Sequence, residues 1–124
     1  MGQASNAATE YFRCVRESDG PGLERVFASD ATLYTYEGTV RRGRGEIRDF
    51  YETRAMGTGV KAYQQAPIED ANRCAVEIIV HHSGGEVFRV VDLFTVDDEG
   101  SITNLHVYRG LLLEGDDVLG VPSS

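Results

Sequence analysis

The fold of this chain is decided by residues 86–113, which read EVFRVVDLFTVDDEGSITNLHVYRGLLL. Apolar residues alternate with others along 86–96 and again along 102–113. Such alternation is typical of strands, and the Asp-Asp-Glu-Gly segment between them is typical of a turn. We therefore expect two long antiparallel strands joined by a hairpin.

Asp92 is the unusual residue of this segment. Successive strand side chains point to opposite faces, so Asp92 shares its face with four apolar residues, Phe88, Val90, Phe94 and Val96. A carboxylate on an apolar face is costly unless it is paired, hydrogen-bonded or protonated. The hairpin places Arg109 beside Asp92 or one residue off. Three interpretations stay open: a structural ion pair with Arg109, a catalytic or ligand-orienting carboxyl group, or a solvent-facing residue if the strand phase is shifted by one.

The upstream sequence alternates between helical and extended patterns. Helices are expected at 6–18, 22–28 and 46–55, and strands at 31–36, 39–42, 60–66 and 73–82. In the last of these strands, we expect Val76, Ile78 and Val80 to form the inner set, which sends Glu77 and His81 outward. A shift of the strand phase by one residue would reverse this. Helices that precede long antiparallel strands indicate an α+β fold with the helices packed on one face of a curved sheet. The 124 residues fit a single domain.

The composition restricts the class of partner. A formal net charge of −8 argues against nucleic acid and against anionic membranes. No apolar run approaches the roughly 20 residues that span a bilayer, and residues 1–10 lack a signal-peptide pattern, so we expect a cytoplasmic protein. Cys14 and Cys74 are expected to be free, buried thiols. The adjacent His81 and His82 point to opposite faces of a strand, so we expect neither a metal site nor another cofactor.

Three short motifs add a family resemblance. They are FASDAT at 27–32, GRGEIRDFY at 43–51 and VVDLFTVDDEGSI at 90–102. In this order of elements, over about residues 7–113, the chain resembles the nuclear transport factor 2-like superfamily, in its SnoaL-like and ketosteroid isomerase-like branch. The resemblance implies a cone-shaped barrel: a strongly curved, mainly antiparallel mixed sheet with three helices packed in its concave face. It also implies a hydrophobic pocket and a homodimer. The ordered core is expected at about 5–113, followed by an acidic tail at 114–124.

The resemblance also assigns roles to individual residues. Tyr11 and Asp92 match the tyrosine and the protonated aspartate that bind an enolate oxygen in ketosteroid isomerases, and Tyr51 matches a supporting tyrosine. Thr35 stands where those enzymes carry the aspartate that moves the proton, and a threonine cannot serve as a base near neutral pH. The remaining residues expected around a ligand are Phe50, Phe88, Val90, Phe94, Val107 and Arg109.

Three functions remain open at this point. The first is isomerase- or cyclase-like acid–base chemistry on a steroid- or polyketide-like oxygenated substrate, with Tyr11 and Asp92 in the pocket. The second is an epoxide hydrolase or dehydratase that uses an Asp92–Arg109 pair. The third is a non-catalytic module that binds a hydrophobic ligand. A shared fold does not decide among them.

Overall fold

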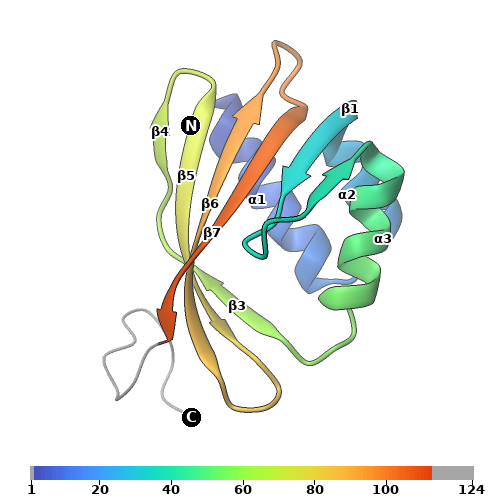
Figure 1. The fold of residues 1–124 in the computed structure, drawn as a ribbon. Coiled ribbons are helices and arrows are strands. Elements are labelled where there is room, and N and C mark those ends of the chain that lie inside the picture. Colours follow the sequence, from blue (N-terminus) through green and yellow to red (C-terminus); the bar gives the residue numbers. More distant parts are fainter. Residues whose placement is uncertain (1, 113–124) are drawn as a thin grey trace.

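The computed structural model describes residues 2–112, which form a curved sheet with three helices on one side (Figure 1). The helices are α1 (Gln3–Arg16), α2 (Gly20–Val26) and α3 (Arg44–Arg54). The strands are β1 (Phe27–Tyr34), β2 (Val40–Arg42), β3 (Lys61–Gln64), β4 (Ile68–Asp70), β5 (Arg73–His81), β6 (Val87–Val96) and β7 (Ile102–Leu112). This arrangement confirms the α+β prediction. The expected tail at 114–124 lies outside the described residues.

The sheet is mixed but mainly antiparallel. Its order is β2-β1-β7-β6-β5-β3, with β4 also paired to β5. Only the β1–β7 pair is parallel among the described strands. The sheet stays open, because β1 and β2 at one end do not pair with β3 at the other. The long β5–β6–β7 meander forms the wall that carries Asp92.

The strand phases follow the sequence. Val90, Asp92, Phe94 and Val96 are buried in β6, and the intervening residues are partly exposed. In β5 the buried Val76 and Ile78 lie on the inner side, whereas Glu77 is exposed and pairs with Arg89 of β6 at 3.6 Å. Cys14 and Cys74 are free and buried, as predicted. Within residues 2–112, no helix is long and apolar enough to cross a membrane.

Several boundaries differ from the expectations, among them the start of β1 at Phe27 instead of residue 31, and one strand was not expected. α2 ends at Val26 instead of residue 28, because Phe27 already pairs with Ile102 of β7. α1 starts at Gln3 instead of residue 6, and the Glu69 carboxylate accepts hydrogen bonds from the backbone N–H groups of Gly2 and Ser5. Glu69 belongs to β4, a three-residue strand too short for alternation to reveal it.

Candidate functional site

A cavity of about 330 Å³ lies between α1, α3 and the inner face of the sheet. Nine of the ten site residues expected from the sequence line it: Tyr11, Thr35, Phe50, Tyr51, Phe88, Val90, Asp92, Val107 and Arg109. The tenth, Phe94, does not. Its ring is fully buried on the inner face beneath Tyr11 and packs edge-on against that ring, with the ring centroids 5.2 Å apart. Phe94 therefore supports the position of Tyr11, and its expected place in the pocket lining was wrong.

Asp92 lies at the deep end of this cavity. Its side chain is 3% exposed, and within residues 2–112 it has no hydrogen-bond or ion-pair partner. Burial raises the pKa of the Asp92 carboxyl group from 3.8 to about 8, since the charged form loses its hydration. At neutral pH the group is therefore mainly protonated, and it can donate a hydrogen bond to a molecule in the cavity.

A pair of tyrosines shares this end of the cavity. The Tyr11 hydroxyl on α1 donates to the Tyr51 hydroxyl on α3 at 2.6 Å, and both residues are buried. Burial raises the pKa of both phenols, and the charge of Asp92 raises them further, so neither ionises near neutral pH. Because Tyr51 accepts from Tyr11, its own proton remains available to a ligand. The deep end thus holds two potential donors, Tyr51 and the protonated Asp92.

Arg109 lies at the other end, at the mouth of the cavity. The backbone of Arg109 pairs with Val90, which lies two residues from Asp92 along β6. Asp92 itself pairs with Val107. The guanidinium group lies 4.6 Å from the Tyr36 ring centroid and 4.7 Å from that of Phe88. Within residues 2–112, Arg109 makes no ion pair with Asp92 or with any other carboxylate. The Asp92–Arg109 pair considered from the sequence is therefore not formed.

Thr35 borders the cavity just beyond the end of β1. Its hydroxyl group lies 2.6 Å from that of Thr39 and also accepts a hydrogen bond from the Thr39 backbone N–H group at 3.2 Å. These bonds hold the turn that leads into β2. Thr35 therefore stabilises this turn. Its side chain has no carboxyl group, so this position supplies no base to move a proton.

Several lining residues escaped the sequence analysis. Glu37 and Arg54 form an ion pair at the rim, and Tyr36 and His82 also line the cavity. The period-two pattern of Val76, Ile78 and Val80 predicts an inward position for the next member of the series, residue 82. Extending the pattern by one step would have found His82. The tight turn after Thr35 brings Glu37 to the rim, and no local periodicity predicts this.

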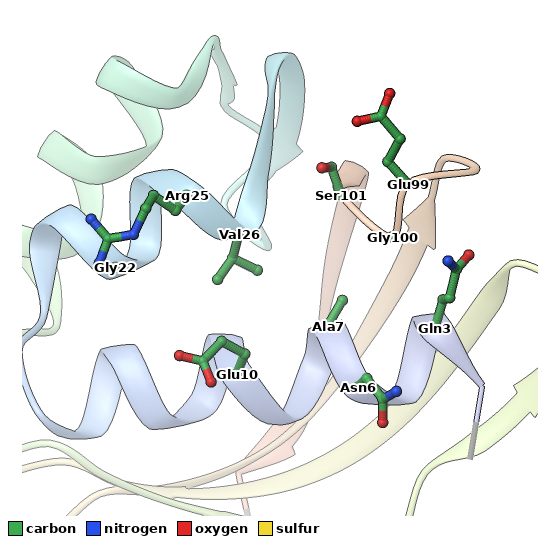
Figure 2. A pocket seen from close by; sticks show the side chains of 10 residues that line it. All are labelled: Gln3, Asn6, Ala7, Glu10, Gly22, Arg25, Val26, Glu99, Gly100 and Ser101. Carbon is green, nitrogen blue, oxygen red and sulfur yellow. The ribbon is translucent and has the colours of Figure 1, made fainter.

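A second hollow, the groove, lies near the start of α1 (Figure 2). It has a volume of about 470 Å³ between α1, α2 and the turn from β6 to β7. Polar residues dominate its lining, among them Gln3, Asn6, Glu10, Arg25 and Glu99. Glu10 is already paired with Arg13 of its own helix. The groove is thus a solvated surface, and the cavity is the better candidate site.

Comparisons with known proteins agree with this geometry. The family model of the SnoaL-like domain matches residues 8–105, and no curated protein matches by sequence. Among solved structures, RV0760c from Mycobacterium tuberculosis, in complex with estradiol-17beta-hemisuccinate, has a TM-score of 0.79 at 20% identity, over 90% of this chain and 96% of that one. A computationally designed 17-OHP binder has a TM-score of 0.79 at 21% identity, with coverages of 90% and 93%. Delta 5-3-ketosteroid isomerase from Mycobacterium sp. has 0.73 at 24% identity, with 87% and 93%. These similarities establish a shared fold.

Proposed function

Because the chain belongs to the SnoaL-like domain family, we propose that its cavity binds an apolar small molecule through a carbonyl or enolate oxygen. The oxygen lies at the deep end and accepts hydrogen bonds from Tyr51 and the protonated Asp92. One observation carries this proposal: Asp92 is buried on the cavity wall with no partner among residues 2–112. A buried polar group without a partner is costly, and a ligand oxygen would offset that cost.

The rest of the lining supports the same class of ligand. Phe12, Val15, Val90 and Val107 give the cavity apolar walls, so a ligand gains affinity by leaving water. Steroid ligands of two proteins that share the fold, estradiol-17beta-hemisuccinate and 17-OHP, belong to this chemical class. We therefore place steroid-like and polyketide-like ketones first among the ligands to test.

A second candidate function is isomerase- or cyclase-like acid–base chemistry at the same site. It is favoured by the proton that Asp92 holds near neutral pH, since a neutral carboxyl group can act as a general acid or stabilise a developing oxyanion. A separate base is harder to place. His82 follows β5 six residues beyond Val76, the partner of Asp92, which corresponds to roughly 20 Å along the strand. His82 therefore lies too far away to act on a carbon next to an oxygen held by Asp92.

The hydrolase alternative loses its support in this geometry. It depended on an Arg109 side chain that orients the Asp92 carboxylate. Arg109 instead stacks on Tyr36 and Phe88 at the mouth. Binding of an oxygenated ligand therefore has the strongest support, and acid–base turnover comes second.

The test compares two replacements of Asp92 with an acetylbiphenyl, a rigid apolar ketone, as the probe. Asp92→Ala removes the donor and should weaken binding of the ketone about tenfold to a hundredfold. Asp92→Asn retains an N–H donor and should stay within a few-fold of the unsubstituted protein. Isothermal titration calorimetry measures the affinity of each protein for the ketone. Glu10→Gln in the groove is the matched control and should leave the affinity for the ketone unchanged, because Glu10 does not line the cavity.

Absence of any ketone binding, or equal affinity in the Asp92→Ala protein, would contradict the binding proposal. Turnover is tested separately by following the conversion of a β,γ-unsaturated ketosteroid to its conjugated isomer by ultraviolet absorbance. Conversion that is lost in both Asp92 variants would support the acid–base function. Conversion at the uncatalysed rate would leave binding alone as the function.

We also propose that the chain forms a homodimer through the outer face of the sheet. Tyr34 stacks on His106 with ring centroids 4.2 Å apart, and Tyr108 continues the stack with its side chain more than half exposed. Aromatic side chains of this kind are common in interfaces. Light scattering should report twice the chain mass, and Tyr108→Glu should lower it to one. A monomeric unsubstituted protein at high concentration would overturn this proposal.

A further inference from the structure

We propose that the ligand of this cavity is an acid, with a carboxylate that Arg109 binds at the mouth while the ligand oxygen lies at Asp92. The inference rests on the proposed function and narrows its ligand class. It predicts a molecule with an apolar body and two unlike polar ends.

The charges around the cavity are not balanced. Its lining contains two carboxyl groups, Glu37 and Asp92, and two guanidinium groups, Arg54 and Arg109. Glu37 and Arg54 neutralise each other in an ion pair. Asp92 is mainly protonated at neutral pH. The charge of Arg109 therefore remains uncompensated within residues 2–112, in a chain whose net charge is −8.

The surroundings of Arg109 orient it for a planar anion. β7 lies between β1 and β6 in the sheet. Tyr36, which follows β1, and Phe88 of β6 therefore approach the guanidinium group from the strands on either side. The guanidinium group lies over both rings, and within residues 2–112 the N–H groups in its plane donate no hydrogen bond. A carboxylate is the anion that accepts two parallel hydrogen bonds in that plane.

The spacing of the two ends sets the length of the ligand. Phe88, which contacts the guanidinium group, is four residues from Asp92 on the same face of β6. Four residues of strand correspond to roughly 13 Å. Val90 lies between them on the same face, and Val107 of β7, the partner of Asp92, also lines the cavity. A rigid, apolar body of two or more rings would fill this distance.

The experiment compares three probes of one shape. They are an acetylbiphenyl, the same ketone with a carboxylic acid at its far end, and the methyl ester of that acid. The acid should bind about tenfold more tightly than the ester at low salt, and the advantage should shrink as salt is added. Arg109→Met should abolish the difference between acid and ester, because it removes the charge and keeps a long side chain at the mouth. Arg109→Lys should retain part of it.

Arg89→Gln is the matched control, because Arg89 lies on the adjacent strand and pairs with Glu77, away from the cavity. It should leave the preference for the acid intact. Equal affinities for acid and ester in the unsubstituted protein would overturn the inference and leave the proposed function standing. An acid preference that survives Arg109→Met, in a protein that unfolds at the usual temperature, would also overturn it. If none of the three probes binds, the proposed function fails, and this inference fails with it.

Discussion

The cavity and the groove are lined by different residues of α1, and each lining contains a carboxyl group, Asp92 in the cavity and Glu10 in the groove. In the groove, hydrogen bonds from Arg13 lower the pKa of the exposed Glu10, whose partners favour the charged form. In the cavity, burial without a partner raises the pKa of Asp92 to about 8. The two groups are chemically similar, so the difference comes from their surroundings. A carboxyl group near a helix gains unusual chemistry when water is excluded and no cation compensates it.

This contrast is tested most strongly by the stability of the folded protein. The pKa of Asp92 is about 8 when folded and near 3.9 when unfolded, so the folded state holds the proton more tightly. No penalty exists below pH 3.9. The penalty grows as pH rises, reaches about 4 kcal/mol at pH 7, and levels off above pH 8. Asp92→Asn should therefore unfold with the same free energy as the unsubstituted protein at pH 3 and be about 4 kcal/mol more stable at pH 7.

Urea unfolding between pH 3 and 9 provides this measurement, with Glu10→Gln as the counterpart. The lowered pKa of Glu10 contributes stability above its unfolded pKa, and that contribution is lost as pH falls. Glu10→Gln should therefore differ from the unsubstituted protein at neutral pH and converge with it in acid, with the opposite sign from Asp92→Asn. If the free energies of unfolding of the two variants changed with pH in the same way, the pKa values of Asp92 and Glu10 would not be shifted in opposite directions.

A smaller effect is expected on ligand affinity. A ketone only accepts hydrogen bonds, so it binds the protonated form of Asp92. Its affinity should be constant below pH 8 and fall roughly tenfold per pH unit above it. In Asp92→Asn the affinity should not depend on pH. Titration of the acetylbiphenyl between pH 6 and 10 measures both, and an affinity that rises with pH would mean that the ionised carboxylate is the binding form.

Much of the cavity was predictable because two patterns coincide in β6. The alternation of apolar residues predicted that Asp92 shares a face with Val90 and Phe94. The family resemblance predicted a fold in which this face points inward. Period-two patterns report which face a residue occupies, but they do not report depth. Phe94 shares the face of Asp92 and still lies outside the cavity, because the Tyr11 ring covers it.

The missed features depend on contacts between distant residues. The position of Arg109 is determined by two aromatic rings, Tyr36 and Phe88. The sequence showed only that Arg109 and Asp92 lie on paired strands, which suggested an ion pair between them. The start of α1 follows from Glu69, which is more than sixty residues away. Propensity and spacing act over a few residues, so tertiary partners of this kind leave no local signal.

The smallest effect separates the two tyrosines at the deep end. Tyr11 donates to Tyr51, so the proton of Tyr51 is the one available to a ligand. Tyr51→Phe should weaken ketone binding by about 1 kcal/mol, a roughly fivefold change. Tyr11→Phe removes only the donor to Tyr51 and should weaken it less. Both variants lose the same buried hydrogen bond, so their losses of unfolding free energy should be similar.

The comparison of these two affinities therefore reports the direction of the hydrogen bond in the complex. If Tyr11→Phe proves the more harmful, the hydroxyl groups rotate on binding, and Tyr51 then donates to Tyr11 while Tyr11 donates to the ligand. Either direction leaves one phenol proton beside the proton of Asp92. If neither variant changes the affinity for the ketone, Asp92 is the only donor to the ligand oxygen. The proton on the buried Asp92 would then be the feature that lets the cavity, and not the groove, bind a ketone.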